Sequence, residues 1–176
     1  MKLLTLKYII VFVYLISSSS SYATQQINIK NLVIHKNPKK LEKINFTNIN
    51  NEKISLNNFK NSLVIINFWA TWCAPCIEEM PSLDRLQANP IFKNLKVLPI
   101  NVGRDNLEKS KKFYKKLKIN NLDIYIDEGI ELANKFLLRG LPTTVFINKE
   151  GKEFARVIGF IDFDNKKIIK WLQNYD

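Results

Sequence analysis

The pattern of apolar and polar positions predicts a buried strand that runs directly into a helix near the middle of the chain. Residues 63–70 are almost all apolar and rich in β-branched side chains, which is typical of a central strand covered on both faces. Residues 73–86 then have apolar side chains at helical spacing, with Pro81 as an expected kink. The junction between these two elements is therefore a sharp turn at one edge of a sheet.

The rest of the chain alternates in the same way. A short hairpin is predicted before the central strand, at residues 44–47 and 53–56. After it we expect strands at residues 96–102, 123–126, 143–147 and 154–158, and helices at residues 107–117, 130–137 and 162–175, the last of them with Asp162 as its N-cap. This order predicts an α/β fold in which helices flank a central mixed sheet.

The first 23 residues have a different pattern. Lys2 and Lys7 give a positive start, residues 8–16 are continuously apolar, and small residues precede a cleavage point after Ala23. These features predict a secretory signal peptide over residues 1–23, with an uncleaved membrane anchor as the alternative. In either case we expect the domain to leave the cytoplasm for the periplasm.

The remaining chain divides into two parts. Residues 24–40 are polar and are interpreted as a linker. Residues 41–176 are long enough for one domain with its own core, and we expect that domain to be a monomer. The composition of 46% apolar and 24% charged residues is that of a globular protein.

The formal net charge of +11 is the other unusual bulk property. Exported proteins rarely meet nucleic acid, so a nucleic-acid partner is not expected. Six lysines between Lys109 and Lys118 favour a solvated helix face. Weak attraction to anionic lipid or to an acidic partner is the alternative interpretation.

The two cysteines, Cys73 and Cys76, stand where the predicted strand turns into the helix. A disulfide between them closes too short a loop to stabilise the fold much, so its value should be chemical. Free N–H groups and the helix dipole favour a thiolate at Cys73, which we predict to be the exposed nucleophile. Cys76, nearly one turn later, is then the shielded resolving thiol.

Three other uses of the pair are less well supported. A zinc site needs about four ligands, and the single histidine, His35, lies in the predicted linker. Covalent haem attachment needs a histidine directly after Cys76, where Ile77 stands. An inert pair is the third alternative. We therefore expect dithiol redox chemistry with no metal and no bound cofactor.

The motif has a specific resemblance. The run Phe68-Trp-Ala-Thr-Trp-Cys-Ala-Pro-Cys76, Pro81 and the run Arg139-Gly-Leu-Pro-Thr-Thr-Val-Phe-Ile147 resemble the thioredoxin superfamily, and within it the exported TlpA/ResA-like thiol–disulfide interchange proteins. The resemblance extends over the whole predicted domain. It implies a thioredoxin-like fold in which residues 107–137 contain an inserted helix–strand unit, interpreted here as extra covering for the sheet.

The resemblance also assigns a substrate site. It implies that Pro142 is cis and faces the cysteine pair. The backbone of Leu141 would then be free to bond an extended substrate, and Trp72 would shape the surface beside Cys73.

Two further residues follow from the same comparison. Classical thioredoxins carry a buried aspartate where this chain has Asn67, which cannot accept a proton. The exported branch has a glutamate six residues after the first cysteine, and Glu79 stands there. Its carboxylate could take the proton of Cys76, although an ordinary exposed helix acid is the alternative.

Together these observations predict an enzyme that reduces disulfides of exported proteins, for example in cytochrome c maturation. The resemblance implies a membrane thiol transporter as electron donor. An oxidant or isomerase of the same fold is the first alternative. A copper-delivery or scaffolding member is the second, although copper delivery would favour a wider cysteine spacing and a downstream histidine.

Overall fold

The computed structural model describes residues 29–176, and the predicted signal peptide over residues 1–23 lies outside this range. Eight strands form one mixed sheet in the order β1-β8-β7-β4-β5-β6-β2-β3. The strands are β1 (Leu32–Lys40), β2 (Asn45–Thr47), β3 (Lys53–Ser55), β4 (Leu63–Trp69), β5 (Leu95–Asn101), β6 (Tyr125–Ile126), β7 (Thr143–Ile147) and β8 (Lys152–Ile158).

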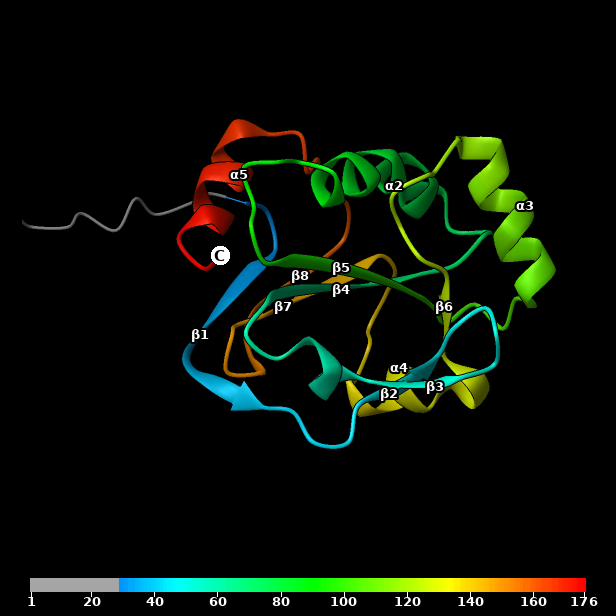
Figure 1. Cartoon of the computed structure of the whole chain (residues 1–176), viewed down its shortest axis with the longest axis horizontal. Coiled ribbons are helices and arrows are strands. Elements are labelled where there is room, and N and C mark those ends of the chain that lie inside the picture. Colours follow the sequence, from blue (N-terminus) through cyan, green and yellow to red (C-terminus); the bar gives the residue numbers. More distant parts are fainter. Residues whose placement is uncertain (1–28) are drawn as a thin grey trace, which may run out of the picture.

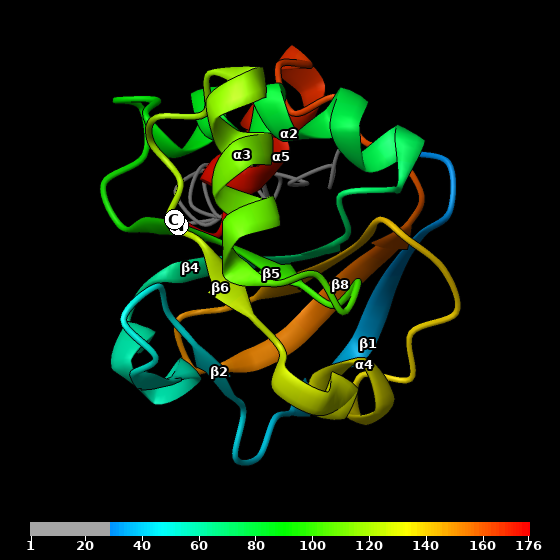
Figure 2. The same cartoon turned by 90° about the vertical axis from the view of Figure 1, so that its right-hand side faces the viewer.

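Helices cover both faces of this sheet. They are η1 (Leu56–Phe59), α2 (Ala74–Gln87), α3 (Leu107–Leu117), η2 (Glu128–Ile130), α4 (Glu131–Lys135) and α5 (Lys166–Gln173). The helices α2, α3 and α5 lie on one face and α4 lies on the other (Figures 1 and 2). Within residues 29–176, none of the helices is both long and apolar enough to cross a membrane.

The strand β4 occupies the centre, and all seven of its residues are buried. Successive side chains of a strand point to opposite faces, so β4 contributes to two separate cores. Leu63, Ile65 and Trp69 pack with the α2–α5 side, whereas Val64, Ile66 and Phe68 pack with the side of α4. This confirms the predicted central strand, and the structure confirms the predicted α/β sheet with its early hairpin.

The predicted linker is wrong over residues 32–40, which form the edge strand β1. This strand pairs antiparallel with β8, and its register shifts in the segment that contains Pro38. The imidazole of His35 bonds the buried carboxylate of Glu153 at 2.7 Å. An edge strand exposes most of its side chains, so a polar sequence concealed its pairing.

Two predicted helix starts are also corrected. The last helix begins at Lys166 with Asn165 as its N-cap, because Asn165 Oδ1 accepts the N–H of Lys167. Asp162 instead accepts the N–H of Asp164 in the preceding turn. The predicted helix over residues 130–137 is reduced to α4, since Ile130 takes a left-handed conformation at its start.

Candidate active site

The two cysteines form a disulfide at the start of α2, with the Cα atoms 5.3 Å apart. Cys73 is the N-cap of the helix, and its Sγ accepts the N–H of Cys76 at 3.3 Å. Pro75 lies in the first turn, where it needs no N–H partner and its fixed φ suits a helix. The local sequence therefore places Cys73 where unpaired N–H groups favour a thiolate.

The disulfide is less accessible than its position at a helix start suggests. Cys73 is 5% exposed and Cys76 is 1% exposed, so the expectation of an exposed Cys73 is wrong for this oxidised form. The adjacent Trp72 is 67% exposed. Ala74 and Pro75, between the two cysteines, are exposed as well, so the surface around the disulfide is formed by its neighbours in sequence.

A buried carboxylate, which the sequence analysis did not identify, fixes the turn before Cys73. Asp105 Oδ2 accepts hydrogen bonds from the backbone N–H and the hydroxyl of Thr71, at 3.0 and 2.8 Å, and from the amide of Asn101. Burial opposes the charge of Asp105, but these bonds and nearby Lys109 outweigh burial and lower its pKa. Nothing about one loop aspartate indicated this role, because its partner lies 34 positions away.

Gly103 allows that loop to come close to the turn. A Cβ atom at Gly103 would lie 2.5 Å from the Cβ of Ala70, a distance that real structures do not tolerate. The carbonyl of Gly103 also accepts the indole N–H of Trp72 at 3.4 Å. The loop between β5 and α3 therefore supports both Thr71 and Trp72.

The segment before β7 lies at the same edge of the sheet. Thr143 of β7 pairs with Phe68 of β4, shortly before the disulfide. The Leu141–Pro142 bond is cis, and the carbonyl of Pro142 accepts the N–H of Gly159 at 2.8 Å. Leu141 packs against the apolar cluster that includes both cysteines. The structure thus brings Leu141, Pro142, Cys73 and Cys76 to one edge of the sheet.

The carboxyl group of Glu79 lies inside the protein, with 1% of the residue exposed. Its Oε1 accepts from Asn67 Nδ2 and its Oε2 accepts from the N–H of Ile161, both at 2.6 Å. The amide of Asn67 also donates to Thr144 Oγ1 at 3.1 Å. The interpretation of Glu79 as an exposed helix acid is therefore wrong.

Burial raises the pKa of Glu79 to about 8, although the hydrogen bonds from Ile161 and Asn67 oppose the shift. No basic side chain of the described residues forms an ion pair with it. Cys76 and Glu79 are three positions apart on α2, so they lie on the same face of the helix. The site therefore combines a disulfide with a carboxylic acid whose pKa lies near that of a thiol.

Asn67 and Ile161 are the partners of Glu79, and sequence reasoning did not identify them as such. The signal available for Asn67 was its amide in an otherwise apolar strand, since a buried polar group requires a partner. Ile161 contributes only its backbone N–H to this contact, so its side chain gave no signal in the sequence.

Comparison with known proteins identifies the family. Residues 38–152, nearly two thirds of the chain, match the AhpC/TSA family. The chain belongs to the AhpC/TSA family. The thiol–disulfide oxidoreductase ResA from a strain of Bacillus cereus is 34% identical over 113 residues, which cover 64% of this chain and 64% of that protein. The match therefore spans less than two thirds of that relative's length.

Solved structures confirm the thioredoxin-like fold. The exposed lipoprotein thioredoxin of Streptococcus pneumoniae is 26% identical with a TM-score of 0.63, covering 75% of this chain and 98% of that chain. A secreted thiol–disulfide isomerase of Corynebacterium glutamicum is 22% identical with a TM-score of 0.70, covering 86% and 97%. The second likeness concerns the fold alone.

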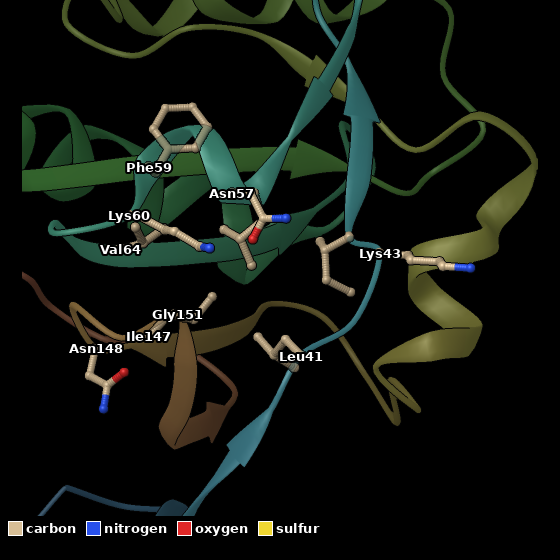
Figure 3. Close-up of a pocket in the computed structure, with 11 residues that line it drawn as sticks. Leu41, Lys43, Asn57, Phe59, Lys60, Val64, Ile147, Asn148 and Gly151 are labelled. Atoms are coloured by element: carbon tan, nitrogen blue, oxygen red, sulfur yellow. The ribbon is translucent and has the colours of Figure 1, made fainter.

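One pocket lies at the opposite end of β4 from the disulfide. Its apolar floor includes Leu41, Phe59, Val64 and Ile147, and Lys43 and Lys60 also line it (Figure 3). The free volume of about 20 Å³ has room for roughly one water molecule. This pocket is too small to hold an organic cofactor.

Proposed function

We propose that this protein is an exported thiol–disulfide oxidoreductase that reduces disulfides of other exported proteins. The observation that carries the proposal is the disulfide at the start of α2 together with Glu79, one turn beyond Cys76. The carboxyl group of Glu79 is buried and has no cationic partner among the described residues. The likeness to ResA over residues that include this site supports the reaction class.

The first step is attack by Cys73. In the reduced protein, its thiolate attacks one sulfur of the substrate disulfide, so that a mixed disulfide forms and one substrate thiolate leaves. The N–H groups at the start of α2 stabilise this thiolate, because Cys73 occupies the N-cap. The exposed indole of Trp72 and the backbone of Leu141 would hold the substrate chain beside the sulfur.

The second step is resolution by Cys76. Its thiol gives up a proton, and the resulting thiolate attacks Cys73 Sγ, which closes the protein disulfide and releases the second substrate thiolate. Two electrons have then passed from the protein to the substrate. We assign the proton to the ionised carboxylate of Glu79, whose pKa of about 8 is close to the usual thiol value of about 8.5. Such a match makes the proton transfer nearly balanced in energy.

The export signal predicted over residues 1–23 supports a periplasmic location, with tethering to the membrane if the segment is not cleaved. Two structural neighbours are described as an exposed lipoprotein and a secreted protein. Re-reduction of the disulfide would then need a membrane thiol transporter. Apocytochrome c is the substrate that the resemblance to TlpA/ResA-like proteins favours.

The position of His35 argues against the copper-delivery alternative. His35 bonds Glu153, which pairs with Ile147 near the start of β4. The imidazole therefore lies toward the opposite end of the central strand from the disulfide, and it offers the cysteines no third ligand.

The reduction potential of the Cys73/Cys76 couple, equilibrated against glutathione, tests the direction of the reaction. We expect a value near that of thioredoxin, about −270 mV, whereas a value near that of DsbA, about −120 mV, would make the protein an oxidant. We also expect Cys76→Ser to accumulate mixed disulfides through Cys73, because the resolving thiol is missing. The matched variant Cys73→Ser should accumulate none; trapping by both variants alike would contradict the assigned roles.

A further inference from the structure

The helix α3 concentrates positive charge beside the disulfide. Residues 104–118 carry seven cationic side chains and two carboxylates, so +5 of the chain's net charge of +11 falls within 15 residues. Fifteen residues of average composition in this chain would carry about +1, so the segment is more basic than the chain as a whole.

Hydrogen bonds hold this segment in place at both ends. At its start, Asp105 binds Thr71, two residues before Cys73. At its end, the carboxylate of Asp84 on α2 accepts the backbone N–H groups of Asn120 and Asn121, at 3.1 and 2.7 Å. The helix therefore has a fixed position next to the turn that carries the disulfide (Figures 1 and 2).

Both of these carboxylates are buried, each 7% exposed, and among the exposed lysines of α3 only Lys109 pairs with one of them, Asp105, at 3.8 Å. The inner side of α3 covers the core through Phe113 and Tyr114, which contact the ring of Trp69. On the outer side, Glu108 is the only exposed carboxylate of the helix, and it pairs with Lys111. Four exposed lysines form no ion pair with the described residues, and we call them the α3 lysine face: Lys112, Lys115, Lys116 and Lys118.

We infer that the α3 lysine face docks an acidic surface of the protein whose disulfide is exchanged at Cys73. This inference rests on the proposed function and names the chemistry of its partner. Ten residues of helix span about 15 Å, so the acidic surface should lie within roughly 10–25 Å of the partner's cysteines. Opposite charges at this distance speed association and set orientation, and salt weakens the effect.

The placement favours a protein partner over a lipid surface. The α3 lysine face lies on the helix that begins after the loop supporting Thr71 and Trp72, so a bound acidic segment would keep the rest of its chain within reach of the disulfide. Binding to a membrane through α3 would instead turn this end of the sheet toward the lipid.

The test compares two synthetic peptides that share one Cys-x-x-Cys disulfide. One carries a segment of aspartate and glutamate about eight residues from the cysteines, and the other carries serine and glutamine there. Stopped-flow fluorescence would give the rate constant of each peptide with the reduced full-length protein at 20 to 300 mM NaCl. We expect the acidic peptide to react about tenfold faster or more at 20 mM, with the ratio falling toward one at high salt.

Variants separate this face from general charge. Replacing all four lysines with glutamine should bring the ratio of acidic to neutral rates to about one, and replacing them with glutamate should bring it below one. The matched control changes four exposed lysines near the opposite end of the sheet to glutamate, and it should keep most of the ratio: Lys36, Lys39, Lys60 and Lys149.

The outcomes are distinct. Equal rates for the two peptides, or equal loss of the ratio in the α3 and control variants, would overturn the docking inference while leaving the oxidoreductase proposal intact. Failure to react with either peptide would instead count against the proposed function. If the peptides react equally but vesicles of anionic phosphatidylglycerol bind the wild type and not the glutamine variant, the face belongs to a membrane and the inference is wrong.

Discussion

Two buried glutamates, Glu79 and Glu153, differ in how the protein compensates their charge. Each is 1% exposed. Glu153 accepts hydrogen bonds from Arg156 at 2.6 and 2.8 Å and pairs with His35 at 2.7 Å, whereas Glu79 has only the neutral donors of Asn67 and Ile161.

This difference sends the two pKa values in opposite directions. Burial raises the pKa of Glu79 to about 8. Burial also opposes the charge of Glu153, but Arg156 and His35 outweigh burial and lower the pKa. Only the carboxyl group beside the disulfide is therefore poised to exchange a proton near neutral pH. The buried acid without a cationic partner, Glu79, is therefore the candidate for proton transfer. The buried acid with two basic partners, Glu153, has a structural role, because it joins β1 to β8 through His35.

The largest effect is expected for Glu153→Ala. This change leaves the guanidinium of Arg156 without its two bonds to the carboxylate and leaves His35 without a partner. Loss of one member of a buried ion pair costs about 3–5 kcal/mol, which urea unfolding at pH 7 would measure. The matched control is Glu150→Ala, whose exposed pair with Lys152 should contribute little to stability.

The pH profile of Glu153→Ala adds a second readout. A lowered pKa contributes stability above the unfolded value of about 4.3 that is lost as the pH falls, so the variant should lose less stability than the wild type on acidification. Equal losses of stability in Glu153→Ala and Glu150→Ala would contradict the structural role of the buried cluster formed by Glu153, Arg156 and His35.

A smaller effect of opposite sign is expected for Glu79→Gln. A carboxyl group with a raised pKa stabilises the fold while it is protonated, and this stability is lost as the pH rises toward 8. The wild type should therefore lose up to about 1.4 kcal/mol per pH unit in this range, and the variant should not. At pH 8 we expect Glu79→Gln to be about 2–3 kcal/mol more stable than the wild type in urea unfolding.

The rate of disulfide exchange should fall in Glu79→Gln, although the stability of the variant rises. If Glu79 accepts the proton of Cys76, the glutamine variant should resolve mixed disulfides about 10²-fold more slowly and lose the rise in rate between pH 7 and 9. The control Glu78→Gln changes an exposed carboxylate next to it in sequence, and its rate should be that of the wild type. A variant that is more stable at pH 8 but unchanged in rate would leave Glu79 as a buried acid without a catalytic role.

The same contrast separates what the sequence could predict from what it could not. The apolar run of β4 and the helical spacing of α2 placed the cysteine pair correctly, because local periodicity determines both elements. The burial of Glu79 could not be seen in this way, since it depends on the backbone of Ile161, which is 82 positions away. Contacts between distant segments carry no local signal.

The strand β1 was not predicted, for a related reason. Its residues are mostly exposed and polar, so nothing in their periodicity indicated that they pair with β8. The buried cluster around Glu153 draws its histidine from this strand, and it therefore remained hidden together with the strand.

The smallest effect that sharpens the comparison is expected for His35→Ala. The change removes one hydrogen bond to Glu153 and leaves both bonds from Arg156 in place. A single hydrogen bond contributes about 1 kcal/mol to stability, so urea unfolding should show a loss of that size. His35→Gln keeps a donor that could reach the carboxylate and should recover part of the loss, whereas Lys36→Ala, at the next and exposed position of β1, should change little.

Because His35 also attaches the edge strand to β8, His35→Ala should speed tryptic cleavage after Lys36 and Lys39 more than after the lysines of α3. A loss of stability in His35→Ala as large as that of Glu153→Ala would mean that the histidine, and not the arginine, is the main partner of this carboxylate.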